Sequence, residues 1–195
     1  MADGTVTATF VIVFRETLEA GLIVGIILTM LSRMGAMRYA RHVWASTAAA
    51  VGVSVVTWWL LSQATQATRG QWQQIIEGVI SVAACAVLTY MVFWMDRQAK
   101  RIRPELEERV EAAVTSRELP AIIALPFLAV FREGAETALF LQAVAIQSSS
   151  AVSLAGGLLG GGLAVAVTAA IFVGGRRIAL KPLFRWTGVL LLFMA

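Results

Sequence analysis

Six stretches of the chain are almost entirely apolar, and polar or charged residues separate them. They cover residues 5–31, 43–61, 75–95, 120–146, 151–173 and 183–195. A helix needs about 20 residues, at about 1.5 Å each, to cross a bilayer, and the first five stretches meet this length or come close to it. The pattern predicts an all-α, polytopic integral membrane protein whose helices form a bundle. The sixth stretch allows only about 20 Å of helix, so we expect the chain to be truncated within its last span.

Charged residues interrupt two of these runs near their middle. A charge at bilayer depth costs about 2.5 to 3.5 kcal/mol on insertion scales, so such residues are rare and usually functional. Both interruptions have the pattern Phe-Arg-Glu-x-x-Glu. The charged members are Arg15, Glu16 and Glu19 in the first run and Arg132, Glu133 and Glu136 in the fourth.

The two motifs indicate an internal repeat. When Phe14 is aligned with Phe131, Leu22 also aligns with Leu139, as do the Arg and Glu residues between them. The copies lie three spans apart, and an odd number of spans reverses the direction of a helix in the membrane. We therefore expect an inverted repeat of three-helix units. Residues 1–195 would form a single membrane domain, with repeat one over about 5–95, a cytoplasmic connector over about 96–119 and repeat two over about 120–195.

The distribution of basic residues predicts the orientation. Lys and Arg gather in the first, third and fifth connections, whereas the second and fourth hold only Arg69 between them. Because cytoplasmic loops carry the excess of Lys and Arg, the odd connections should be cytoplasmic and the N-terminus outside.

The composition agrees with this class. Of 195 residues, 58% are hydrophobic and 14% charged, and the mean hydropathy of +0.77 is too high for a soluble domain. The net charge of +4 comes with basic residues placed between spans, so we expect no nucleic-acid partner but contact with the lipid bilayer. Cys85 is the only cysteine, which excludes a thiolate metal cluster, and we expect it to be a small core residue.

The motif residues form one polar stripe on each helix, because at 100° per residue Arg15, Glu16 and Glu19 fall within an arc of about 100°. If the two stripes face each other, four carboxylates and two guanidinium groups converge with an excess of two negative charges. Carboxylate oxygens suit hard cations, whereas Cu(I) or zinc would call for Cys, Met or His. Arginine stays charged and can brace carboxylates through several donors. We therefore interpret the motifs as a cation site, in preference to buried ion pairs that only join helices.

Two further features leave alternatives open. Glu77, near the outer end of the third span, is either an access ligand that passes a cation inward or an interfacial glutamate that reaches headgroup water. The small residues of the fifth span, Gly156 and Gly160 among them, and Gly21 and Gly25 of the first span indicate close helix packing, within one subunit or in a dimer.

With these motifs, the chain resembles the oxidase-dependent iron transporter family, which comprises high-affinity and EfeU-type iron permeases. The resemblance also covers 76–78 (Ile-Glu-Gly), 88–95 (Leu-Thr-Tyr-Met-Val-Phe-Trp-Met) and 184–188 (Phe-Arg-Trp-Thr-Gly). It implies a multi-pass permease of the plasma or inner membrane that imports Fe³⁺ or Fe²⁺. The iron-binding residues would be Glu16, Glu19, Glu133 and Glu136, with Arg15 and Arg132 as their motif partners.

The resemblance further implies a transporter and not an enzyme, with iron as the transported substrate and no permanently bound cofactor. Its implied partners lie outside the cell: a multicopper oxidase, or a periplasmic iron-binding protein with a haem peroxidase. Two alternatives remain. Paired Glu-x-x-Glu segments also occur in di-iron carboxylate oxidases, although these normally add histidines, and no span here contains one. The same oxygen ligands would also accept another cation, such as Pb²⁺ or Mn²⁺.

Overall fold

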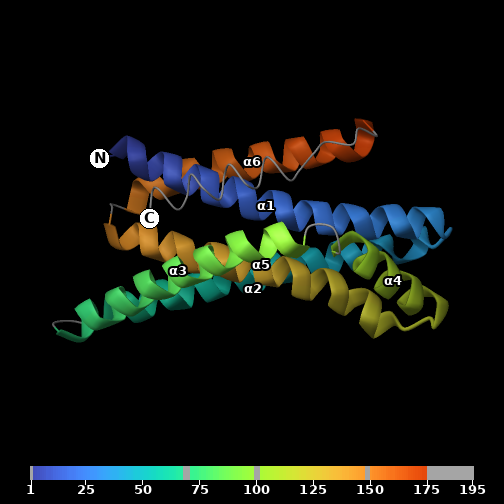
Figure 1. The fold of residues 1–195 in the computed structure, drawn as a ribbon, viewed down its shortest axis with the longest axis horizontal. Helices are drawn as coiled ribbons and strands as arrows, with labels where there is room; N and C mark the ends of the chain where they lie inside the picture. Colours follow the sequence, from blue (N-terminus) through green and yellow to red (C-terminus); the bar gives the residue numbers. More distant parts are fainter. Residues whose placement is uncertain (1, 68–70, 99–101, 148–149, 175–195) are drawn as a thin grey trace.

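The computed structural model describes residues 2–67, 71–98, 102–147 and 150–174, and every regular element in these ranges is a helix (Figure 1). Each of the first five predicted apolar runs is confirmed as a helix; the sixth run and the fifth connection lie outside the described residues. The elements are α1 (Ala2–Arg33), η1 (Met37–Tyr39), α2 (Ala40–Ala67), α3 (Gln71–Gln98), α4 (Ile102–Thr115), α5 (Leu119–Gln147) and α6 (Ser150–Gly174).

Three of the described helical stretches have both the length and the composition of a membrane span: Met37–Thr65, Gln74–Met91 and Leu154–Phe172. They expose large apolar side chains, such as Val55 of α2, Val82 of α3 and Leu158 of α6, as helices that face lipid do. The helices α1 and α5 are also long enough to cross a membrane, but each carries the three charges of its motif. Cys85 is exposed on α3, so its prediction as a core residue is wrong.

The helices associate in two close pairs, α1 with α6 and α2 with α5, and the pairs meet where α1 contacts α5 (Figure 1). α1 and α5 run in opposite directions along the molecule (Figure 1). The two motifs lie where these central helices meet, about halfway along each of them. The bundle therefore places both polar stripes on one helix interface, away from its ends.

Glycines allow α6 to lie directly on the backbone of α1. A Cβ atom at Gly156 would be 2.6 Å from the carbonyl oxygen of Val6, and one at Gly160 would collide with the carbonyl oxygen of Phe10. A Cβ at Gly25 would likewise overlap the ring of Phe172 on α6. These glycines are thus used for packing within one subunit, the first of the two alternatives that the sequence left open.

Replacing Gly160 should destabilise the protein far more than replacing its neighbour Gly162. The methyl group of Gly160→Ala would collide with the backbone carbonyl of Phe10, which is fixed within α1. Overpacking of this kind typically costs about 1 to 3 kcal/mol. A Cβ at Gly162 meets nothing within 4 Å, so Gly162→Ala should be neutral or stabilising, since alanine is the better helix former. Thermal unfolding of both variants in detergent checks this; equal unfolding temperatures would contradict the packing of α6 on α1.

Corresponding contacts occur in both helix pairs. The motif alignment makes Thr17 of α1 correspond to Gly134 of α5; Gly134 lies against Ser54 of α2, and Thr17 lies beside Gly161 of α6. Two phenylalanines also stack one turn apart at each motif, with ring centroids 6.0 Å apart for Phe10 and Phe14 and again for Phe127 and Phe131. These observations agree with the predicted inverted repeat, which stays a prediction, as does the outside placement of the N-terminus.

The connector between the two predicted repeats forms α4. This helix packs against the C-terminal end of α1 and the N-terminal end of α5. Val110 and Ala113 are buried there, in one apolar cluster with Ile27, Leu31 and Ile122. The apolar side of α4 therefore docks onto α1 and α5.

Candidate cation site

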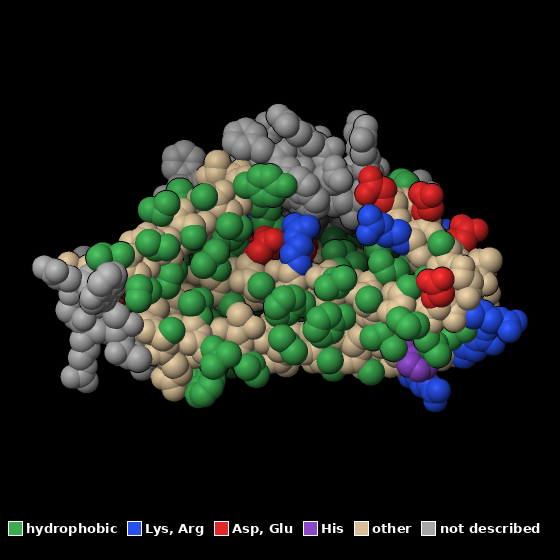
Figure 2. Space-filling view, turned by 90° about the horizontal axis from the view of Figure 1, so that it is seen from below, with side chains coloured by type: hydrophobic (Ala, Val, Ile, Leu, Met, Phe, Trp, Pro, Cys, Tyr) green, Lys and Arg blue, Asp and Glu red, His purple; other side chains and the backbone are tan. Residues whose placement is uncertain are grey.

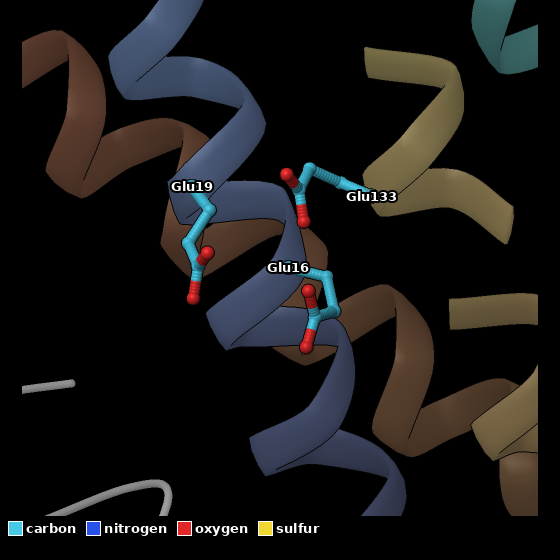
Figure 3. Close-up of side chains that lie close together, drawn as sticks. All are labelled: Glu16, Glu19 and Glu133. Carbon is cyan, nitrogen blue, oxygen red and sulfur yellow. The ribbon is translucent and has the colours of Figure 1, made fainter. Parts of the chain in front are cut away.

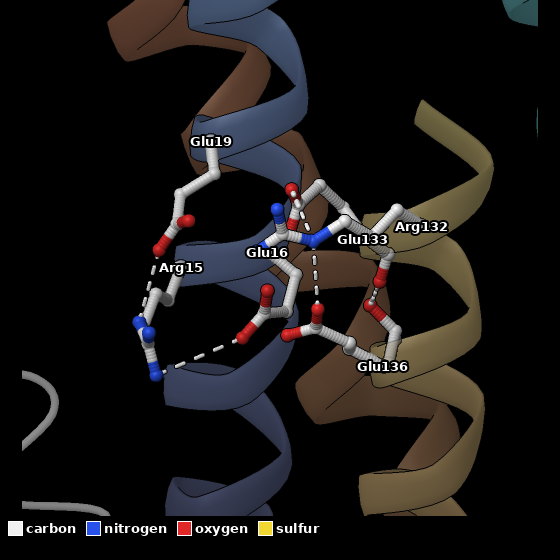
Figure 4. A network of polar contacts seen from close by, with 7 residues as sticks. Arg15, Glu16, Glu19, Arg132, Glu133 and Glu136 are labelled. Atoms are coloured by element: carbon white, nitrogen blue, oxygen red, sulfur yellow. Dashed lines mark hydrogen bonds and ion pairs between the residues drawn. The ribbon is translucent and has the colours of Figure 1, made fainter. Parts of the chain in front are cut away.

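The six charged motif residues lie together at the interface of α1 and α5, and the arginine of each motif binds the carboxylates of its own helix (Figure 4). Within each motif the arginine Nε donates to the carboxylate four residues later: Arg15 to Glu19 at 3.1 Å and Arg132 to Glu136 at 3.0 Å. Each arginine also lies 3.8 Å from the carboxylate that follows it, Glu16 or Glu133. The spacing of the motif on a helix thus produces the same local arrangement twice.

Three carboxylates converge between the helices (Figure 3). Glu16 and Glu19 project from α1 and Glu133 from α5, and one oxygen of each lies within 4.8 Å of the others. All three residues are buried, with Glu16 only 1% exposed. Oxygen atoms at this separation can close around one hard cation with small side-chain movements.

The hydrogen bonding of this group is incomplete. Both carboxylate oxygens of Glu16 and the Oε2 atom of Glu133 are buried and accept no hydrogen bond. A buried charge is strongly unfavourable unless it is paired or coordinates a metal. Glu16 has Arg15 as an ion-pair neighbour at 3.8 Å, but because neither of its oxygens accepts a hydrogen bond from the described residues, both could bind a cation.

Glu136, the fourth predicted ligand, belongs to the network but not to this group of three. Its Oε1 atom accepts the bond from Arg132, while its Oε2 atom is buried and accepts none (Figure 4). The carboxylates of the two motifs are therefore used unequally, which the sequence repeat did not predict.

The two arginines also differ in their surroundings. The side chain of Arg15 is 1% exposed, whereas that of Arg132 is 43% exposed. The space-filling view shows basic and acidic groups together at the middle of an otherwise apolar face, with the other charges gathered near the end formed by α4 (Figure 2). The site is therefore closed around Arg15 and accessible on the side of Arg132.

The structure does not bring the remaining candidate into the cluster. Glu77 is half-buried on α3, and it is not among the three carboxylates that converge. Its role as an access ligand stays a prediction. The only histidine, His42, begins α2 and lies near Tyr39, with ring centroids 6.3 Å apart, so the carboxylate group has no imidazole ligand among the described residues.

The whole chain is similar to a family of known proteins. Residues 6–195 match the family described as "Iron permease FTR1 family". The chain is 35% identical over 188 residues to the ferrous iron permease EfeU of Yersinia pestis, covering 95% of this chain and 67% of that protein. It is 32% identical to the protein of the same name from Escherichia coli O6:H1 (strain CFT073), covering 95% and 68%. The chain thus spans about two thirds of the length of these relatives. No solved structure matches it.

Proposed function

The chain belongs to the iron permease FTR1 family, and from this we propose that it imports iron through the carboxylate cluster of Glu16, Glu19 and Glu133. The observation that carries the proposal is the buried Glu16, whose two oxygens lack hydrogen bonds and face carboxylates from both motifs. Carboxylate oxygens are the ligands that a hard divalent or trivalent cation prefers. Iron is thus the transported substrate, and no permanently bound cofactor is required.

The other charged residues have supporting roles in this proposal. Arg15 donates to Glu19 at 3.1 Å and Arg132 donates to Glu136 at 3.0 Å. These bonds fix the position of one carboxylate on each helix beside the shared site. Glu136 joins the coordination shell when its side chain turns from Arg132 towards the ion. Glu77 receives iron from outside and passes it to the cluster.

We further propose a direction and a location. The positive-inside rule places the end of the bundle with α4 in the cytoplasm, in a multi-pass protein of the plasma or inner membrane. The inverted repeat places the cluster near the midplane, as in other transporters built in this way. Iron then enters at the start of α1, is held between α1 and α5, and leaves towards α4.

The protein acts as a transporter rather than an enzyme, because its relatives are named permeases. A di-iron oxidase would be expected to use Glu-x-x-His ligands, and the described cluster has only carboxylates. The relatives' name also favours Fe²⁺ as the transported ion. The extracellular partners implied by the family, a multicopper oxidase or a periplasmic iron-binding protein with a haem peroxidase, would prepare iron for uptake.

Uptake assays can decide the transported ion. In iron-starved cells that express the protein, radioactive iron kept as Fe²⁺ with ascorbate should enter faster than Fe³⁺ citrate. An excess of Mn²⁺ or Pb²⁺ should compete weakly, and cells expressing Glu133→Gln should take up iron only at background level. If Mn²⁺ or Pb²⁺ is the better substrate, or if iron enters at background level with the unaltered protein, the proposal is wrong.

A further inference from the structure

We propose that α4 is the inner gate of the transport path: its buried face closes the space between α1 and α5, and iron leaves when α4 undocks. This inference rests on the proposed function, because it concerns the exit from the carboxylate cluster. It starts from the position of α4, which joins the two repeats and yet packs between the inner ends of both motif helices.

The charged site lies between two apolar layers. On the predicted outer side, Val11 and Ile12 of α1 pack with Ala84 of α3 and Phe140 of α5. On the inner side, Ile27 and Leu31 of α1 pack with Ile122 of α5 and with Val110 and Ala113 of α4. The first layer precedes the motif on α1 and follows it on α5, so the two layers enclose the site along both helices.

The inner layer consists of buried apolar side chains. It surrounds a cavity of about 10 Å³, lined by Ile27, Leu31, Val110, Ala113, Ile122 and Leu125. Such a volume holds one water molecule at most, and an apolar cavity of this kind stays dry. Hydrophobic constrictions block ions because the ion cannot keep its hydration shell. Some part of this layer must therefore move before a cation can pass.

Of the helices in the layer, α4 is the one held least firmly. α1 is fixed to α6 by direct backbone contact at Gly156 and Gly160, and α5 is fixed to α2 at Gly134 and by the buried bond from Gln142 to Thr65, of 2.8 Å. α4 is held through Val110 and Ala113, with Leu106 and Val114 partly buried beside them. Its opposite face is exposed and bears Glu105, Glu108 and Glu111.

The turn that joins α4 to α5 can act as the hinge. Arg117 has a φ of 54°, a left-handed conformation that non-glycine residues rarely adopt. The backbone N–H of Glu118 donates to the carbonyl of Ala113 at 3.0 Å, which ends α4 sharply at this point. A change in the backbone at Arg117 would swing α4 away while leaving α5 and its motif in place.

Cross-linking α4 to α1 tests the gate. In the full protein with Cys85→Ser, Leu31→Cys and Ala113→Cys place two thiols on the same small cavity. The control pairs Leu31→Cys with Ala112→Cys, because Ala112 is exposed on α4. Radioactive iron uptake is measured in membrane vesicles after oxidation with copper phenanthroline and again after reduction with dithiothreitol, and the cross-linked fraction is measured by the mass of a protease-nicked sample.

We expect oxidation to reduce uptake by the Leu31/Ala113 pair in proportion to the cross-linked fraction, and reduction to restore it, while the control pair keeps its uptake throughout. The gate is contradicted if the cross-linked protein takes up iron as fast as the same protein after dithiothreitol treatment. It is also contradicted if the thiols at positions 31 and 113 do not pair in a protein that reaches the membrane. If the reduced protein does not take up iron while Cys85→Ser alone does, the substitutions have disturbed the layer. A second pair on the same cavity, Ile27→Cys with Val110→Cys, then replaces the first, and unchanged uptake after it has been cross-linked contradicts the gate. The absence of uptake with the unaltered protein would instead contradict the proposed function.

Discussion

Cells that express Glu16→Gln should lose iron uptake almost completely, by more than about a hundredfold. Glu16 is 1% exposed and both of its carboxylate oxygens lack hydrogen bonds, so glutamine removes the charge that the cation would neutralise while keeping the shape. Loss of an outer-shell partner of a metal ligand already costs about 10- to 100-fold in affinity or activity, and loss of a ligand should cost more. Initial rates of radioactive iron uptake, corrected for the amount of protein in the membrane, measure the effect.

Two other glutamates serve as comparisons for Glu16→Gln. Glu136→Gln should reduce uptake by about tenfold, because Glu136 is bound by Arg132 and stands outside the group of three. Glu108→Gln should leave uptake unchanged, since Glu108 is exposed on α4. Equal losses for Glu16→Gln and Glu136→Gln would contradict the placement of Glu136 outside the group of three.

The second large effect is on stability, and it should differ between the two arginines. Arg15→Gln leaves the buried Glu16 and Glu19 without their cationic neighbour, and breaking a buried ion pair by removing one partner typically costs about 3 to 5 kcal/mol. We therefore expect Arg15→Gln to unfold at a much lower temperature in detergent and to accumulate poorly in the membrane.

The equivalent change in the second repeat serves as the control. The side chain of Arg132 is 43% exposed, so Arg132→Gln should destabilise the protein less than Arg15→Gln does, although it also removes the cationic neighbour of the buried Glu133. The double variant Arg15→Gln/Glu19→Gln should recover part of the loss, because it removes one of the two uncompensated charges. Similar unfolding temperatures for Arg15→Gln and Arg132→Gln would contradict the burial difference.

The sequence was sufficient to predict the helices and the polar stripe that each motif forms. Each apolar run from 5–31 to 151–173 is a helix, because a bilayer requires long segments that satisfy their own backbone hydrogen bonds. The arc that holds Arg15, Glu16 and Glu19 follows from helix geometry alone. Two such arcs with a charge excess inside a membrane have few favourable arrangements other than facing each other, and the structure has them on one interface.

Other features depend on packing that no local pattern reveals. The two motifs are identical in their charged residues, and Glu19 and Glu136 each accept a hydrogen bond from the arginine of their own motif. Glu19 nevertheless lies in the group of three and Glu136 does not, because the surroundings of α1 and α5 differ. The exposure of Cys85 could not be inferred either, since in a membrane an apolar residue is equally suited to the core or to lipid. The docking of α4 likewise depends on the gap that α1 and α5 leave between their inner ends.

The most direct test of the central claim is X-ray absorption at the iron edge, on purified protein loaded with Fe²⁺ without oxygen. We expect tightly bound iron with a first shell of oxygen atoms only, lost in Glu133→Gln and kept in Glu108→Gln. Glu133 is the decisive position, because it is the residue through which α5 completes a group otherwise formed by α1. Iron bound equally well by Glu133→Gln, or a first shell containing nitrogen or sulfur, would contradict a carboxylate site shared by the two motifs.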